Sequence, residues 1–170
     1  MGRPQCDTIM VAYDGGPNAD RAIGYAAHYL SATTCHVVTA WETGMQQSAR
    51  LSTYSGGMQP LLDTRFDSQV DAALLAEAEQ TNARGVDLAR QAGLTATGRM
   101  VEVTSTVWGT LVHAADDLDV DVLVIGTRGA SGLKALLRSS VAERVLKHCH
   151  RPVLVVPAGC GAVEETAGQN

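Results

Sequence analysis

The sequence is poor in aromatic and charged residues and contains no long apolar run. Its 170 residues include a single phenylalanine, with 4% aromatic and 18% charged residues beside 45% hydrophobic ones. This balance is typical of a globular chain and excludes a disordered one. A membrane-spanning helix needs about 20 apolar residues in succession, and no run approaches that length. We therefore expect one globular domain that does not enter a membrane.

An excess of basic residues is also missing. Eighteen aspartate and glutamate residues stand against 13 lysine and arginine residues, so the formal net charge is −5. Because nucleic acids and anionic membranes attract basic surfaces, we expect neither as the main partner. The first residues, Met1–Cys6, contain no apolar segment of the kind found in a signal peptide. We therefore expect a cytoplasmic protein.

Cysteines at metal-binding spacing are absent too. The chain has four scattered cysteines, Cys6, Cys35, Cys149 and Cys160, without a C-x-x-C motif. In a cytoplasmic protein we expect them to be reduced thiols. Cys35 and His36 are adjacent, and neighbouring residues on a strand point to opposite faces, so the two cannot easily share one ion. We expect no zinc site.

The sequence does contain a regular alternation of two kinds of segment. Short apolar runs are typical of buried parallel strands, and segments with apolar residues at helical spacing lie between them. The expected strands are Thr8–Asp14, Cys35–Glu42, Thr95–Val103, Val122–Ile125 and Val153–Val156. The expected helices run from Pro17 to about Ser31, from Asp67 to about Ala92, from Ser105 or Thr106 to Asp117, and from Ser139-Ser140 to His148. This alternation predicts an α/β fold, a doubly wound five-stranded parallel sheet with helices on both faces.

Two of these helices have a distinct apolar stripe, which is expected to face the sheet. The stripe of the long helix consists of Val70, Leu74, Ala78, Thr81 and Leu88. The stripe of the last helix consists of Val141, Val145, Leu146 and Cys149.

The stretch Val120–Val156 carries the most specific pattern. After its first apolar run come Gly126-Thr127-Arg128-Gly129, nine further residues and then Ser139-Ser140. Ser140 and Glu143 form a capping-box pattern, which predicts a helix start. Backbone N–H groups at a helix start favour an anion such as phosphate, and glycines let a ligand approach the backbone. The stretch is therefore a candidate phosphate-binding loop.

This pattern resembles the nucleotide-binding signature of the universal stress protein family, which is Gly-x-x-Gly, nine residues, Gly, then Ser or Thr. Gly126, Gly129 and Ser140 match the spacing, and Ser139 stands where the family has its third glycine. The apolar strand that ends at Asp14, followed by an alanine-rich helix, is also similar to the opening of the family. The resemblance covers residues 6–157.

The resemblance implies a strand order of 3-2-1-4-5 and a Rossmann-like crevice outside the carboxyl ends of the first and fourth strands. It implies an adenine nucleotide there, ATP, ADP or AMP, with or without Mg²⁺. The carboxylate of Asp14 suits ribose hydroxyls or a magnesium ion bound through water. The implied nucleotide-binding residues are Ala12, Tyr13, Asp14, Ala40, Ile125, Gly126, Arg128, Gly129, Ser139, Ser140 and Val141.

The remaining segments are expected to lie outside the regular fold. Residues 1–5 are expected to be a flexible N-terminus, and residues 158–170, which are small, polar and acidic, a disordered tail. Residues 43–63 are longer than an ordinary connection and form a loop insertion, either a mobile lid or a tolerated surface insertion.

Two functions stay open. The first is a nucleotide-binding stress-response switch, favoured by Gly126, Gly129 and Ser140. The alternative is a stress-related dimerisation and partner-binding module without nucleotide, favoured by Ser139. The family resemblance implies a homodimer formed through the last strand, Val153–Val156.

Catalysis has little support in the sequence. The P-loop motif is absent, no G-x-G-x-x-G follows a predicted strand, and Asp14 lacks the second acid that a phosphoacceptor domain would want. No Ser–His or Cys–His pair can be assigned to one site. We expect at most weak ATP hydrolysis.

Overall fold

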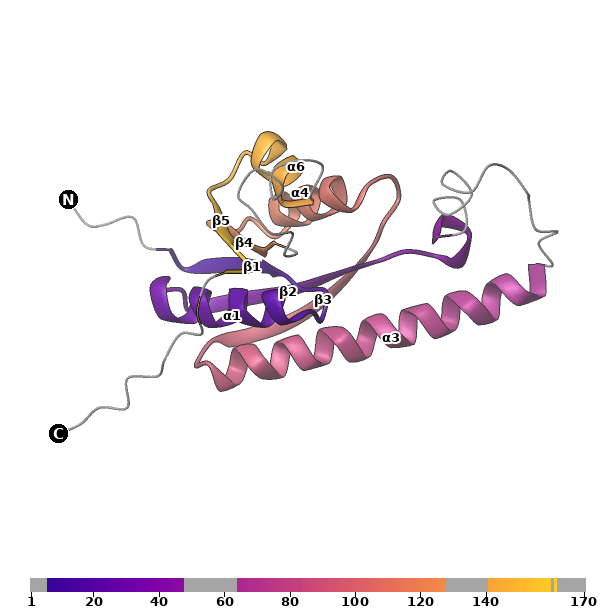
Figure 1. The fold of residues 1–170 in the computed structure, drawn as a ribbon, viewed down its shortest axis with the longest axis horizontal. Helices are drawn as coiled ribbons and strands as arrows, with labels where there is room; N and C mark the ends of the chain where they lie inside the picture. Colours follow the sequence, from indigo (N-terminus) through magenta and orange to yellow (C-terminus); the bar gives the residue numbers. More distant parts are fainter. Residues whose placement is uncertain (1–5, 48–63, 128–140, 160, 162–170) are drawn as a thin grey trace.

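The fold is a parallel sheet between two layers of helices. The computed structural model describes residues 6–47, 64–127, 141–159 and 161. The strands are β1 (Thr8–Ala12), β2 (Thr34–Trp41), β3 (Thr95–Glu102), β4 (Val122–Gly126) and β5 (Val153–Val156). They pair in parallel in the order β3-β2-β1-β4-β5 (Figure 1), which confirms the predicted fold class and strand order.

The helices begin close to where capping residues and proline predict. They are α1 (Pro17–Tyr29), α3 (Thr64–Gln91), α4 (Val107–Asp117) and α6 (Val141–His148). Pro17 opens α1, where its fixed φ suits the first turn. Thr106 caps α4, because its hydroxyl accepts the N–H of Gly109 at 3.2 Å. Among the described residues, no helix combines the length and the apolar character that crossing a bilayer requires.

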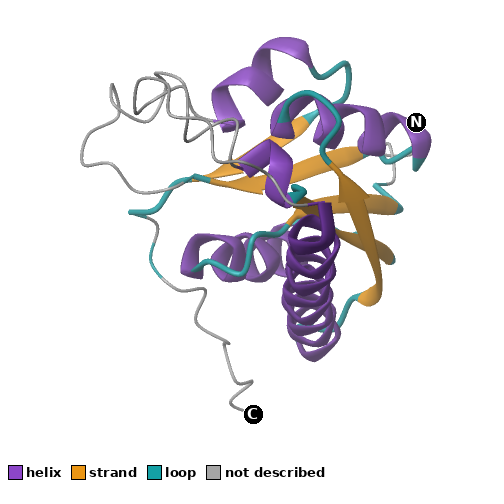
Figure 2. Ribbon diagram, turned by 90° about the vertical axis from the view of Figure 1, so that its right-hand side faces the viewer, coloured by secondary structure: helices purple, strands orange, loops and turns teal. Residues whose placement is uncertain are grey.

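The sheet separates two apolar cores. Because neighbouring side chains of a strand point to opposite faces, Ile9 and Val11 pack under α1 and α3, while Met10 packs under α4 and α6. The same alternation divides Val37 from Val38. All five side chains are fully buried. Figure 2 shows the strands between the two helix layers.

The two predicted apolar stripes are each wrong in part. Val70 is 43% exposed, because α3 is longer than the sheet it covers and its first half projects past the strands (Figure 1). A helix of 28 residues spans about 42 Å, and a strand of eight residues spans about 26 Å. In α6, Val141 and Leu146 are exposed, whereas Ala142 and Val145 are buried. The small Ala142 occupies the place that the prediction gave to a larger side chain.

The acidic end of α4 has a partner that the sequence pattern does not indicate. Arg151, just before β5, donates hydrogen bonds to the carboxylates of Asp116 at 3.2 Å and Asp119 at 2.9 Å. It also donates to the carbonyl oxygen of Val120 at 2.7 Å. Asp119 adopts a φ of 50°, a left-handed conformation that aspartate tolerates better than most residues. Arg151 thus offsets the unfavourable position of these acids at a helix C-terminus.

Candidate functional site

A cavity of about 1040 Å³ opens where β1 and β4 end. Ala12 and Ile125 are paired in register at the ends of these two strands, so Asp14 and Gly126 follow them on the same wall. Strand order reverses at this point of the sheet, and the cavity therefore lies where the topology places a ligand crevice.

Most of the site residues implied by the resemblance can be located. Seven of them line this cavity, namely Ala12, Tyr13, Asp14, Ala40, Ile125, Gly126 and Val141. The other four lie outside the described residues, namely Arg128, Gly129, Ser139 and Ser140.

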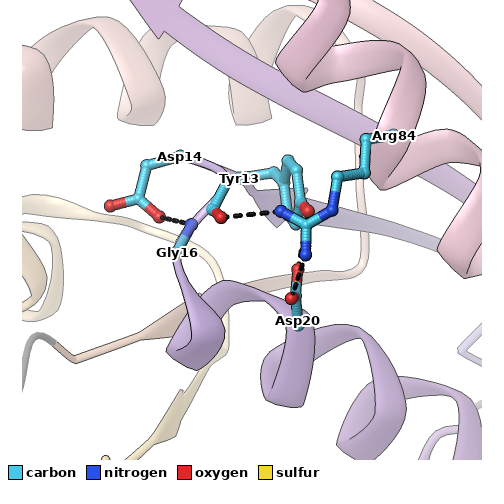
Figure 3. Close-up of polar contacts among 6 residues, drawn as sticks. Tyr13, Asp14, Gly16, Asp20 and Arg84 are labelled. Carbon is cyan, nitrogen blue, oxygen red and sulfur yellow. Dashed lines mark hydrogen bonds and ion pairs between the residues drawn. The ribbon is translucent and has the colours of Figure 1, made fainter.

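The loop after β1 has a defined conformation. Gly15 has a φ of +78°, which L side chains rarely adopt. The backbone N–H of Gly16 donates to Asp14 Oδ1 at 3.0 Å (Figure 3). One carboxylate oxygen of Asp14 therefore caps its own turn. The side chain is nevertheless exposed at the mouth of the cavity.

Arg84 of α3 holds this loop from the other side. Its guanidinium donates to the carbonyl oxygen of Gly15 at 2.8 Å and pairs with the carboxylate of Asp20 on α1 (Figure 3). The second oxygen of Asp20 accepts the hydroxyl hydrogen of Tyr13 at 2.6 Å. The loop is therefore tied to both helices of this face.

Tyr13 has an internal role in addition to its place on the cavity wall. Its side chain is 2% exposed, and its ring lies against Gly85, where an added Cβ would be 2.6 Å from ring atom Cδ1. Burial and then the hydrogen bond to Asp20 raise the pKa of Tyr13. The phenol therefore stays neutral and packs between α1 and α3. Its hydroxyl already donates a hydrogen bond to Asp20.

Gly126 lies against the backbone of Asn18 and also lines the cavity. A Cβ at this position would lie 2.6 Å from the carbonyl oxygen of Asn18 and 2.8 Å from its carbonyl carbon. The end of β4 and the start of α1 therefore approach each other too closely for any side chain. This contact accounts for the glycine without a ligand.

Several residues that line the cavity are not predicted from the sequence. Those next to strand ends or loops already identified are Gly15, Gly16, Thr39, Glu42 and Thr127, and their position at the carboxyl end of a strand could have indicated them. Those from α3 are Leu74, Glu77, Ala78 and Thr81. No local pattern indicates the second group, because its place depends on how far α3 projects past the sheet.

The start of the predicted 43–63 insertion is ordered into a helical turn at residues 44–47. Thr43 and Gln46 form a reciprocal capping box. The hydroxyl of Thr43 accepts the N–H of Gln46 at 3.4 Å, and the side-chain oxygen of Gln46 accepts the N–H of Thr43 at 3.0 Å. The pattern T-x-x-Q could have revealed this turn. Glu42 precedes this turn and Gln47 is its last residue, and both line the cavity.

The described part of the cavity wall is acidic. It carries the carboxylates of Asp14, Glu42 and Glu77, and no lysine or arginine is among the lining residues described. Across the described ranges, no three histidine, cysteine or acidic side chains are grouped to hold a metal ion. A phosphorylated ligand would therefore need positive charge from outside this part of the wall.

A second, smaller cavity of about 340 Å³ borders α4 and the end of α6. Trp108 stacks on His148 there, with ring centroids 4.6 Å apart. This contact packs α4 against the end of α6. His113 and His150 line the same surface.

The sequence matches a known family over nearly all of these elements. The family described as the universal stress protein family matches residues 6–157. A universal stress protein of Thermus aquaticus is 28% identical over 151 residues, which cover 88% of this chain and 97% of the relative. The universal stress protein MJ0531 of Methanocaldococcus jannaschii is 50% identical over 46 residues, and that match spans only 27% of each chain.

Solved structures share the fold. The structure of MJ0577, with a TM-score of 0.68 and 21% identity, covers 92% of this chain and 99% of its own. A universal stress protein from Archaeoglobus fulgidus in complex with dAMP has a TM-score of 0.59 and 20% identity, over 88% and 97% of the two chains. A universal stress protein in complex with cAMP has a TM-score of 0.54 and 25% identity, over 88% and 95%.

Proposed function

Because this chain belongs to the universal stress protein family, we propose that the cavity at the ends of β1 and β4 binds an adenine nucleotide. The nucleotide can be ATP, ADP or AMP, and its binding makes the protein a stress-response switch. The observation that carries the proposal is that Ala12–Asp14 and Ile125–Gly126, two segments far apart in sequence, line one cavity. The dAMP and cAMP complexes of related proteins support it.

The described residues fit a nucleoside. A cavity of about 1040 Å³ slightly exceeds the roughly 300–1,000 Å³ typical of small-molecule sites, so a nucleoside has room in it. Ala40 and Ala12 give the wall apolar surface for a base, and the exposed carboxylate of Asp14 can accept hydrogen bonds from ribose hydroxyls. The nucleoside end therefore belongs beside β1 and β2.

The phosphates need positive charge that the described wall lacks. Residues 128–140 contain Arg128, Lys134 and Arg138, together with Gly129 and Ser140 of the family signature. We propose that this segment supplies the phosphate contacts. A magnesium ion would add charge compensation between the phosphates and the acidic wall.

Calorimetric titration of the nucleotide-stripped protein with ATP and Mg²⁺ tests this function. We expect micromolar binding that Gly129→Val abolishes, because a branched side chain would block the approach of phosphate to the backbone. Gly24→Val is the matched control, since a Cβ on Gly24 of α1 would meet nothing within 4 Å. Absence of heat and of thermal stabilisation at millimolar ATP would refute the proposal. Binding restored only by Ser139→Gly would favour the alternative, a partner-binding module without nucleotide.

We also propose a homodimer formed through β5. This strand is at the edge of the sheet and pairs with β4 alone among the described strands. Its residues Val153, Leu154 and Val155 are only half-buried. An apolar edge strand of this kind favours pairing with a second copy. Sedimentation at micromolar concentration is expected to give twice the monomer mass, and the mass of a single chain would contradict the dimer.

A further inference from the structure

One peptide unit lies between the side chain of Arg84 and the carboxylate of Asp14. Arg84 Nη1 donates to the carbonyl oxygen of Gly15 at 2.8 Å. The N–H of Gly16, at the other end of the same peptide, donates to Asp14 Oδ1 at 3.0 Å. Because a trans peptide directs its C=O and its N–H to opposite sides, Arg84 and Asp14 hold it from the two sides of the loop (Figure 3). The two hydrogen bonds therefore connect α3 to the carboxylate at the mouth of the cavity.

This peptide needs an outside contact to keep one orientation. Both of its residues are glycines, so no side chain restricts the two dihedral angles that turn the peptide plane, ψ of Gly15 and φ of Gly16. The carbonyl oxygen of Gly16 accepts two N–H groups from the first turn of α1, at 3.0 and 3.1 Å, which holds that carbonyl and leaves the preceding peptide able to turn. The carbonyl of that peptide is held by Arg84. A rotated peptide would direct its N–H away from Asp14.

Arg84 influences the cavity from outside it. It is not among the described residues that line the cavity, whereas the loop Asp14–Gly16 is. Its side chain is 53% exposed, and its second guanidinium nitrogen pairs with Asp20, which keeps the guanidinium at the loop. Asp20 also accepts the hydroxyl hydrogen of Tyr13, which lines the cavity too, so a second route leads from Arg84 to a ligand. The two routes predict different couplings between Arg84 and Asp14.

We propose that Arg84 is a positioning residue for the ribose of the bound nucleotide. Its hydrogen bond fixes the peptide between Gly15 and Gly16, and the N–H of that peptide fixes the carboxylate of Asp14. The carboxylate in turn accepts hydrogen bonds from ribose hydroxyls. A hydrogen bond to the carbonyl also polarises the peptide and strengthens the bond that its N–H donates. The inference rests on the proposed nucleotide function, and it adds a residue of α3 that the glycine-rich signature does not contain.

Calorimetric titration of Arg84→Met with adenosine and with dideoxyadenosine, which lacks the two secondary ribose hydroxyls, tests the inference. Both ligands are uncharged, so the loss of a positive charge does not act on them through long-range attraction. We expect adenosine to bind roughly fivefold more weakly to the variant than to the wild type, the equivalent of about one hydrogen bond. Dideoxyadenosine should bind the two proteins within about twofold of each other. Lys147→Met is the matched control and should leave both affinities unchanged, because Lys147 is 62% exposed and pairs with Glu143 on α6.

A double-mutant cycle identifies the route. If Arg84 acts through Asp14, Arg84→Met should weaken adenosine no further in a protein that already carries Asp14→Ala. Additive effects of the two substitutions would assign the influence of Arg84 to the path through Asp20 and Tyr13, and that result would overturn the inference. Equal weakening of adenosine and dideoxyadenosine by Arg84→Met would overturn it as well, because general damage to the loop affects both ligands.

The wild-type protein separates this inference from the proposed function. If it binds neither adenosine nor ATP with Mg²⁺, both are overturned. If it binds ATP but not adenosine, or binds adenosine and dideoxyadenosine equally, the ribose hydroxyls contribute no measurable affinity and this inference alone is overturned. Unchanged adenosine affinity in Arg84→Met has the same consequence. If that variant does not fold, Arg84→Gln, which is shorter than arginine and carries no charge, is measured in its place.

Discussion

The guanidinium of Arg84 donates a hydrogen bond to the carbonyl oxygen of Gly15 at 2.8 Å. This contact connects the C-terminal half of α3 to a glycine whose φ of +78° forms the turn after β1. The same guanidinium pairs with Asp20, so the loop that carries Asp14 is held between α3 and α1. The cavity wall thus depends on a contact between segments that are distant in sequence.

Replacing Arg84 with methionine should lower the free energy of unfolding by about 1–2 kcal/mol. The change removes one hydrogen bond to a backbone carbonyl and one ion pair, and the ion pair adds little because the Arg84 side chain is 53% exposed. Lys147→Met is the matched control, since Lys147 pairs with Glu143 one turn away on α6 and is 62% exposed. Its loss should cost about 0.5 kcal/mol or less. Equal effects in urea denaturation would show that the contact with Gly15 contributes nothing.

Two glycine-to-alanine substitutions should change stability in opposite directions. Gly126→Ala should destabilise the protein by about 2 kcal/mol, because the new methyl group would lie 2.6 Å from the carbonyl oxygen of Asn18. Gly24→Ala should stabilise it by about 0.5–1 kcal/mol, because Gly24 lies inside α1 with open space around its Cβ position. Thermal unfolding of both variants measures the difference. A stable Gly126→Ala variant would refute the close approach of β4 and α1.

The carboxylate of Asp121 should make stability depend on pH in the acid range. Its two hydrogen bonds from the backbone N–H groups of Thr8 and Asp7, each 2.9 Å long, lower its pKa below the usual range. The unfolded chain therefore takes up the proton first. The stabilisation is present above the ordinary aspartate pKa of about 3.9 and is lost as pH falls through the lowered value.

Asp121→Asn should consequently be less stable than the wild type at pH 7, and the gap should narrow as the solution is acidified. Chemical denaturation at a series of pH values measures both. Asp87→Asn, at an exposed position of α3, is the matched control for the loss of one carboxylate. A gap that stays constant down to about pH 2 would show that Asp121 is not linked to folding in this way.

The thiol of Cys35 should be inert in the folded protein. It is fully buried on β2, and burial raises its pKa to about 12, so almost no thiolate is present at pH 8. Iodoacetamide at pH 8 should modify the half-buried Cys149 first and reach Cys35 only after denaturation. Mass spectrometry of the digested protein distinguishes the sites. Modification of Cys35 in the native protein at the rate of Cys149 would place it at an accessible position instead.

The sequence predicts the sheet well because the apolar pattern within each strand indicates which of its residues are buried. The apolar run Val122–Ile125 corresponds to β4 with one residue added, and the alternation in β1 follows the two cores. Pro17 and Thr106 likewise mark helix starts through their own backbone chemistry. These features depend on neighbours in sequence.

The contacts that shape the cavity could not be predicted in the same way. Arg84 meets Gly15, and Arg151 meets Asp119, only because the sheet topology brings their segments together. Gly126 fits a family signature, yet its close neighbour is the backbone of Asn18, which belongs to another element. The size of α3 relative to the sheet also decides which of its residues reach the cavity. Local patterns carry no information on these distances.

The most direct test of the central claim is to map the nucleotide on the protein by NMR. Titration of ¹⁵N-labelled protein with AMP should shift the amide resonances of Asp14, Gly15 and Thr127 at the cavity between β1 and β4. The amides of Trp108 and His113, beside the second cavity, should stay unchanged. Shifts confined to Trp108 and His113, or no shifts at millimolar AMP, would contradict a nucleotide site at the ends of β1 and β4.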